Sequence, residues 1–205
     1  MLVKICGITN SKDALLAVNL GAWALGFNFY EQSPRYISPE RAKEIIQQLP
    51  TGIVTVGIFM NASSESINQI CAITRIQMLQ LHGDESLNFC KQFSCPVIKV
   101  IRPRTSDDLL ELDNYPDLFA VLVDAYSDQL RGGTGLCADW LLAAEIAAKR
   151  SILLAGGLDA DNVVEAIRSV KPQMIDVCSG VEQSPGAKSL LKMHALFRAL
   201  QQGGY

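Results

Sequence analysis

The sequence predicts an α/β fold, a single-domain (β/α)8 TIM barrel, on three observations. Short runs rich in valine, isoleucine and leucine recur along the chain, and each is followed by a stretch with the period of an amphipathic helix. The runs are almost continuously apolar, which is typical of parallel strands that are covered on both faces. Eight strand–helix units are enough to close a parallel barrel. The predicted strands are residues 2–6, 23–29, 53–59, 76–81, 96–101, 119–124, 151–155 and 174–178.

Helix start signals support this order of elements. Residues 39–49 are predicted to form a helix, because Ser38 is a good N-cap, Pro39 suits the first helical position and Glu40 complements the helix dipole. Later helices are expected to start at Ser63, Asp84 and Ser106.

Two longer irregular segments, residues 29–38 and 125–137, each follow a predicted strand. Loops of this length inside a short chain are usually functional. In a parallel barrel the loops that follow the strands surround the active site, so both segments are expected to lie beside it.

The composition is that of an ordinary globular protein, with 205 residues of which 49% are hydrophobic and 19% charged. Residues 1–205 are expected to form one domain, because no linker-like segment interrupts the pattern. A formal net charge of −3 without a basic stripe argues against nucleic acid as a partner. The chain start lacks the features of a signal peptide, and no apolar run reaches membrane-spanning length. We therefore expect a cytoplasmic monomer or homodimer that binds no membrane.

The six cysteines have irregular spacings without a Cys-X-X-Cys motif, and only two histidines are available for a metal site. Disulfides and metal ions are therefore not expected. Cys71 and Cys90 are expected to be small buried hydrophobes on helices. Cys6 differs, because it ends the first apolar run directly before Gly7. Lys4 points to the same face of that strand and would favour a reactive thiolate at Cys6, although a buried packing thiol is the competing interpretation.

Three other polar residues end or follow predicted strands. Asp124 closes the sixth strand, where exclusion of water favours a protonated carboxyl group that can donate its proton; the alternative is a structural acid that caps the next loop. Arg35 follows the second strand, and its planar guanidinium suits a carboxylate ligand, although a solvated loop arginine fits that segment equally well. His82 ends the fourth strand and is either a structural loop residue or a wall of the pocket.

Two glycine-containing turns follow the last two predicted strands. Gly156 and Gly157 lie in the first turn, and Ser179 and Gly180 lie in the second. These two loops of a (β/α)8 barrel commonly hold a phosphate group, because exposed backbone N–H groups and a helix N-terminus attract negative charge. Either turn alone would fit a tight turn without a ligand. Their occurrence in this pair of units predicts a small phosphorylated ligand.

Taken together, these segments resemble the phosphoribosylanthranilate isomerases of tryptophan biosynthesis. The matching segments are, in chain order, KICGIT, GFNFYEQSPRYIS, VGIF, QLHGDE, VLVDAY, RGGTG, LAGGL and DVCSGVEQSPGAKS. The resemblance implies an Amadori rearrangement of N-(5′-phosphoribosyl)anthranilate without metal or cofactor, with Cys6 as general base and Asp124 as general acid. It also implies that Arg35 faces the anthranilate carboxylate. The phosphate site that it implies consists of Gly156, Gly157, Ser179 and Gly180.

The chain departs from the family pattern at two notable points. Leu136-Cys137-Ala138 replaces the usual basic or polar residue and aromatic, and Cys178 stands where the family more often has asparagine or serine. One alternative is the aminoaldose isomerase of histidine biosynthesis, which is expected to use two aspartates and is disfavoured by Cys6. A bifunctional enzyme would need a second phosphate loop near the middle of the chain, where no paired glycines occur. A non-catalytic phosphometabolite-binding barrel would not need both the acid and the base.

Overall fold

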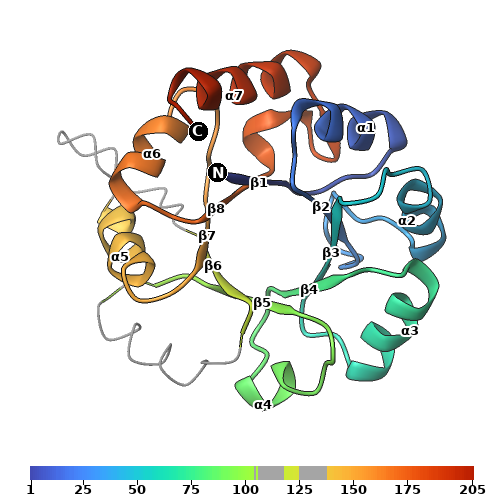
Figure 1. Ribbon diagram of the computed structural model, residues 1–205. Helices are drawn as coiled ribbons and strands as arrows, with labels where there is room; N and C mark the ends of the chain where they lie inside the picture. Colours follow the sequence, from blue (N-terminus) through green and yellow to red (C-terminus); the bar gives the residue numbers. More distant parts are fainter. Residues whose placement is uncertain (104, 106–117, 125–137) are drawn as a thin grey trace.

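The computed structural model describes residues 1–103, 105, 118–124 and 138–205. Its eight parallel strands close into a barrel in sequence order, and the helices surround them (Figure 1). Each of the eight barrel strands lies within one of the predicted ranges, and the predicted (β/α)8 TIM barrel is confirmed. The strands are β1 (Leu2–Ile5), β2 (Ala24–Asn28), β3 (Val54–Phe59), β4 (Met78–Leu81), β5 (Val97–Ile101), β6 (Ala120–Asp124), β7 (Ile152–Ala155) and β8 (Met174–Val177).

The helices that the structure describes follow every strand except β5, after which most of the chain lies outside the described residues, including the predicted helix start at Ser106. The predicted loop 125–137 also lies outside them. None of the described helices is both long and apolar enough to span a membrane. The helices are α1 (Ser11–Leu20), α2 (Pro39–Ile46), α3 (Ser64–Thr74), α4 (Leu87–Cys90), α5 (Ala138–Ala147), α6 (Val163–Val170) and α7 (Leu190–Gln202).

Two of the predicted helix starts are confirmed. The side-chain oxygens of Ser38 and Ser63 accept hydrogen bonds from the third following backbone N–H and so cap α2 and α3. Helix α2 ends at Ile46 rather than at residue 49. The chain tightens after Ile46, because the backbone N–H groups of Gln48 and Leu49 donate to carbonyl oxygens three residues earlier, at Ile45 and Ile46.

The predicted helix start at Asp84 is wrong, because Ser86 is the N-cap of α4. The backbone N–H of Asp84 instead donates to Oδ1 of Asn61 at 2.7 Å, and that of Gly83 donates to Oε2 of Glu85 at 2.9 Å. These contacts hold the segment as a loop, so the helix starts two residues later than the local sequence suggests.

Side chains of the strands alternate between the barrel interior and the surrounding helices. Leu25 and Phe27, for example, belong to the apolar layer beneath the helices, whereas Ala24 belongs to an apolar cluster inside the barrel. Both faces are covered, which explains the almost continuous apolar runs. The other members of the inner cluster are Val56, Ile98, Val100, Ala120, Leu122, Leu153, Ala155 and Met174.

The chain after β8 adds a small element at one end of the barrel. A 3-10 turn, η2 (Ser179–Val181), leads into an antiparallel pair of short strands, β9 (Glu182–Ser184) and β10 (Ala187–Lys188). The side chains of Glu182 and Lys188 are buried within this element. It brings two charged groups from the end of the chain to the carboxyl ends of β1 and β8.

Candidate active site

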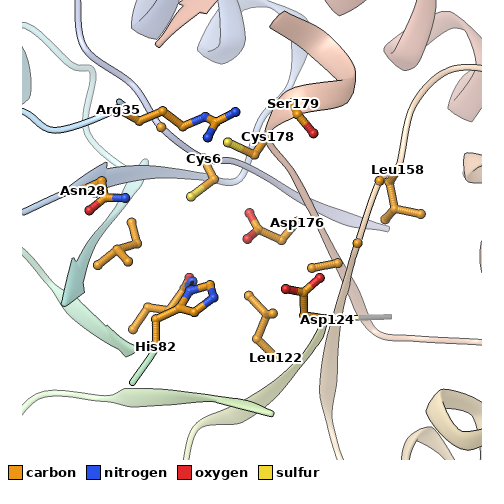
Figure 2. A pocket seen from close by; sticks show the side chains of 16 residues that line it. Cys6, Asn28, Arg35, His82, Leu122, Asp124, Leu158, Asp176, Cys178 and Ser179 are labelled. Carbon is orange, nitrogen blue, oxygen red and sulfur yellow. Dashed lines mark hydrogen bonds between the residues drawn. The ribbon is translucent and has the colours of Figure 1, made fainter. Parts of the chain in front are cut away.

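A cavity of about 400 Å³ opens at the carboxyl ends of the barrel strands (Figure 2). Residues from β1, β2, β3, β4, β6, β7 and β8, or from the loops that follow these strands, line it. The structure therefore brings together side chains that lie far apart in the sequence. The predicted site residues that line the cavity are Cys6, Arg35, Asp124, Gly156, Gly157 and Ser179.

Gly180 does not line the cavity. It instead allows the loop after β8 to pack closely against the loop after β7. A Cβ atom at Gly180 would lie 2.0 Å from the carbonyl oxygen of Leu158, so a side chain there would collide with the loop after β7. Gly156 and Gly157 have φ angles of +99° and +65°, a region that side chains disfavour. The three glycines therefore allow the loops after β7 and β8 to lie against each other.

Lys4 and Asp176 form an ion pair on the floor of this site. They occupy paired positions on the neighbouring strands β1 and β8, and Nζ of Lys4 lies 2.8 Å from Oδ1 of Asp176. The lysine side chain is completely buried. Burial opposes the charge of Lys4, but the charge of Asp176 and the hydrogen bond to it keep the pKa of Lys4 above its usual value.

Cys6 follows β1 and points into the cavity (Figure 2). A hydrogen bond from the Cys178 thiol favours the Cys6 thiolate, and the positive charges of Lys4 and Lys188 favour it further; burial and the charge of Asp176 oppose them. Together these effects lower the pKa of Cys6 to about 7. The predicted influence of Lys4 on the thiol is therefore confirmed, but the largest contribution comes from Cys178.

Gly26 on β2 provides the space that the Cys6 thiol occupies. A Cβ atom at Gly26 would lie 2.9 Å from Sγ of Cys6 and 3.2 Å from its Cα. Any larger residue would displace the thiol from the cavity. The sequence contains no local signal for this role, because Gly26 lies inside an ordinary apolar strand.

Arg35 reaches the cavity from the loop after β2, where Glu182 holds its guanidinium group. Nε and Nη2 of Arg35 donate to the Glu182 carboxylate at 3.0 and 2.7 Å. The arginine side chain remains 24% exposed, whereas that of Glu182 is 4% exposed. Glu182 thus fixes the orientation of a cation that lines the cavity, with the geometric specificity of a two-point contact.

Lys188 extends this network toward the two cavity thiols. Its buried Nζ lies 3.0 Å from Oε1 of Glu182 and donates to the carbonyl oxygen of Cys178 at 3.2 Å. The same nitrogen lies 3.9 Å from Sγ of Cys178. Arg35, Glu182 and Lys188 therefore form a continuous charged network behind Cys178, and the positive charge of Lys188 supports the thiolate of Cys6.

Asp124 ends β6 and lines the cavity together with His82 (Figure 2). Nε of Arg102 lies 3.2 Å from Oδ2 of Asp124, and Nη2 of Arg102 lies 2.7 Å from Nε2 of His82. Burial and then the charge of Arg102 lower the pKa of His82, so the neutral ring accepts the hydrogen bond from the arginine. His82 is thus a wall of the cavity, one of the two roles predicted for it.

Sequence reasoning missed several residues of this site. Asp176 lies in β8, Glu182 in β9 and Lys188 in β10, and Arg102 directly follows β5. Each acts through a partner that is distant in the chain. The usable sequence signals were a charged residue inside an apolar strand, for Asp176, and a position directly after a strand, for Arg102.

The chain was compared with known proteins. Residues 3–199 match the family model described as N-(5′-phosphoribosyl)anthranilate (PRA) isomerase. A protein of Pelobacter propionicus named N-(5′-phosphoribosyl)anthranilate isomerase is 48% identical over 200 residues, which are 98% of this chain and 95% of that relative.

Two solved structures of phosphoribosyl anthranilate isomerases are also similar to this chain. The phosphoribosyl anthranilate isomerase of Thermotoga maritima has a TM-score of 0.90 at 36% identity, with 98% of this chain and 99% of that chain covered. A phosphoribosyl anthranilate isomerase in complex with reduced 1-(o-carboxyphenylamino)-1-deoxyribulose 5-phosphate has a TM-score of 0.88 at 36% identity, covering 98% of this chain and 100% of that one. Because the family model and a close relative both extend over almost the entire chain, the chain belongs to the N-(5′-phosphoribosyl)anthranilate isomerase family.

Proposed function

We propose that the chain catalyses the Amadori rearrangement of N-(5′-phosphoribosyl)anthranilate to 1-(2-carboxyphenylamino)-1-deoxyribulose 5-phosphate in tryptophan biosynthesis. One observation carries this proposal: a cysteine with a lowered pKa and a strand-end aspartate, Cys6 and Asp124, line the same cavity. They project from β1 and β6, which are not neighbours in the barrel. A sugar bound between them would meet a base on one side and an acid on another.

Asp124 is the general acid of the proposed reaction. In its protonated form it donates to the furanose ring oxygen, and the ring opens as the anthranilate nitrogen forms a Schiff base with C1. The nitrogen of the substrate then serves as the electron sink for the following step.

Cys6 is the general base. Its thiolate removes the proton from C2 of the open-chain sugar, and the electron pair moves toward the protonated nitrogen to give an enolamine. Tautomerisation of this enolamine yields the aminoketose. A pKa near 7 suits this role, because the thiolate is then well populated near neutral pH while its conjugate thiol can still return a proton.

The two ends of the substrate are proposed to bind at different parts of the cavity. The loops after β7 and β8 present backbone N–H groups and the Ser179 hydroxyl for the phosphate. Arg35, oriented by Glu182, faces the carboxylate of the anthranilate ring. Binding energy from both ends fixes the sugar between Cys6 and Asp124.

The test is a fluorescence time course with freshly generated phosphoribosylanthranilate. Conversion by the unmodified chain, with formation of the aminoketose verified by mass spectrometry and NMR, is the expected result. Tight binding of the reduced product without any conversion would contradict the proposed activity, and it would instead support a barrel that only binds phosphorylated metabolites.

The activity is expected to depend on pH through the Cys6 thiolate. Below a pKa of about 7 the thiol is protonated, so the contribution of the thiolate to kcat/KM should fall by about tenfold for each pH unit toward acid. Cys178→Ala removes the hydrogen bond that contributes most to the lowered pKa, so the acid-side fall of kcat/KM should move to higher pH. Cys178→Ser keeps a donor and is the matched control, in which kcat/KM should fall near the same pH as in the parent. An acid-side fall that does not move in Cys178→Ala would contradict this account of the thiolate.

The close approach of the two glycine-rich loops is expected to control phosphate binding. Gly180→Ala would force the loop after β8 away from the Leu158 carbonyl and should raise KM by about ten- to a hundredfold, with a smaller effect on kcat. Steady-state kinetics measure both constants. Gly52→Ala is the control, because Gly52 has a positive φ angle but no atom within 4 Å of its Cβ position and precedes β3 at the other end of the barrel. An unchanged KM in Gly180→Ala would exclude this role.

A further inference from the structure

Cys6 and Cys178 occupy adjacent positions at the ends of β1 and β8. Lys4 pairs with Asp176 and Ile5 pairs with Val177 in the register of these strands. The backbone N–H of Cys6 then donates to the carbonyl oxygen of Val177 at 2.9 Å, so the ladder continues beyond the last paired strand residues. Cys6 and Cys178 are the next two residues of this ladder.

The side chains of these two cysteines share one face. Side chains along a strand alternate, so Cys6 and Cys178 point in the same direction as Lys4 and Asp176, two residues earlier on each strand. The side chains of that earlier pair touch at 2.8 Å. Both thiols line the cavity, and the Cys178 thiol is the largest influence on the lowered pKa of Cys6.

The spacing of the strands permits a covalent bond between the two sulfur atoms. Neighbouring strands lie about 4.8 Å apart, and disulfides join residues whose Cα atoms are about 4.4–6.8 Å apart. The Cys178 sulfur already lies on the side of β1, because a Cβ atom on Gly7 would be only 3.2 Å from it. The strand spacing therefore meets the distance requirement for a disulfide between the two cysteines.

The surrounding charges make one of the two thiols the nucleophile. Lys4 and Lys188 stabilise negative charge at Cys6, whereas the hydrogen bond to Cys6 and burial raise the pKa of Cys178. Arg35, Glu182 and Asp176 complete the ionisable groups that face the pair. An oxidant that enters the cavity thus meets a thiolate at Cys6 with a protonated thiol beside it, which is the arrangement of a reactive cysteine and its resolving cysteine.

We propose that Cys6 and Cys178 form a redox pair that hydrogen peroxide converts into a disulfide and that a dithiol reductant restores. The Cys6 thiolate attacks one oxygen of the peroxide, the O–O bond breaks, and the released hydroxide takes up a proton to become water. The sulfur of Cys178 then attacks the sulfur of the Cys6 sulfenic acid, and the S–O bond breaks as the second water leaves with the Cys178 proton. Two thiols are oxidised to one disulfide while one peroxide is reduced to two waters.

The formation of this disulfide does not require the proposed function, but its consequence does. A disulfide would consume the general base, so oxidation is expected to stop the rearrangement reversibly.

The primary test is peptide mapping after oxidation. The folded chain is treated with hydrogen peroxide, free thiols are alkylated, and the protein is digested with trypsin without reduction. The expected product is a covalent link between peptides 5–12 and 169–188, each of which contains one cysteine. Dithiothreitol should separate the two peptides. The proposal would be overturned if Cys178 were alkylated while Cys6 was either alkylated as well or oxidised to sulfinic acid.

Two variants sharpen this test. Cys71→Ser removes a thiol on α3 whose pKa is raised to about 11 by burial, and it should leave the link unchanged. Cys178→Ser should abolish the link and leave a Cys6 sulfenic acid that dimedone traps. Without a resolving thiol, excess peroxide oxidises this sulfenic acid further to sulfinic acid, which dithiothreitol does not reduce, so the activity should return only in part. A linked peptide in Cys178→Ser that joins Cys6 to another cysteine would also contradict the assigned pair.

Activity separates this proposal from the proposed function. If the reduced chain converts phosphoribosylanthranilate but no linked peptide forms, the redox pair is wrong and the isomerase stands. If the linked peptide forms but the reduced chain shows no conversion, the redox pair stands and the isomerase assignment is wrong.

Discussion

Replacing Cys6 by serine is expected to lower kcat by about 10²- to 10⁴-fold, the usual contribution of a general base. Serine has nearly the same shape but ionises far less readily than a thiol, so the variant would lose the base while it keeps the cavity. The affinity for the reduced product should therefore change little. Steady-state kinetics with phosphoribosylanthranilate measure the first effect, and a fluorescence titration with the reduced product measures the second.

Cys71→Ser is the matched control for this experiment. Cys71 is a partly exposed cysteine on α3 that packs against the outer apolar layer and does not line the cavity. Its replacement should leave kcat and the product affinity close to those of the parent. If Cys6→Ser kept most of the kcat of the parent, another group of the cavity would have to be the general base.

The fold could be predicted from the sequence because its signals are local. Each strand is a short apolar run, and the polar residue that ends such a run marks the carboxyl end of the strand. Cys6 and Asp124 were found in this way, and the structure places both at one cavity. The false helix start at Asp84 has the opposite cause, because contacts with Asn61, which precedes α3, decide the conformation there.

The electrostatic support of the site could not be predicted in the same way. Arg35 and Glu182 are 147 positions apart, and Lys4 and Asp176 are 172 positions apart. These pairs meet only because β1 and β8 close the barrel. The sequence therefore indicates which residues end strands, but it does not indicate which charge lies beside which thiol.

The sequence also does not indicate that the two cavity thiols, Cys6 and Cys178, are neighbours. Irregular cysteine spacing argued against disulfides, and Cys178 stood out only as a departure from the family pattern. The register of β1 and β8 makes Cys178 the neighbour of Cys6 and the largest cause of its lowered pKa. Reactivity at Cys6 is thus a property of two strands and not of the KICGIT segment alone.

Replacing Asp124 by asparagine is expected to lower kcat by a similar factor, about 10²- to 10⁴-fold, because an amide cannot act as the acid that opens the furanose ring. The amide keeps the size of the carboxyl group, so the cavity should be preserved. Asp84→Asn is the matched control, since Asp84 lies in the loop after β4 and does not line the cavity. Steady-state kinetics compare the three proteins.

Substrate deuterated at C2 distinguishes the two roles. In Cys6→Ser the removal of the C2 proton becomes the slow step, so kcat/KM should show a large primary isotope effect. In Asp124→Asn the earlier ring opening becomes slow, so the isotope effect on kcat/KM should nearly vanish. The reverse pattern would exchange the roles of the two residues. Large isotope effects in both variants would place Asp124 in the proton transfer at C2 and not in ring opening.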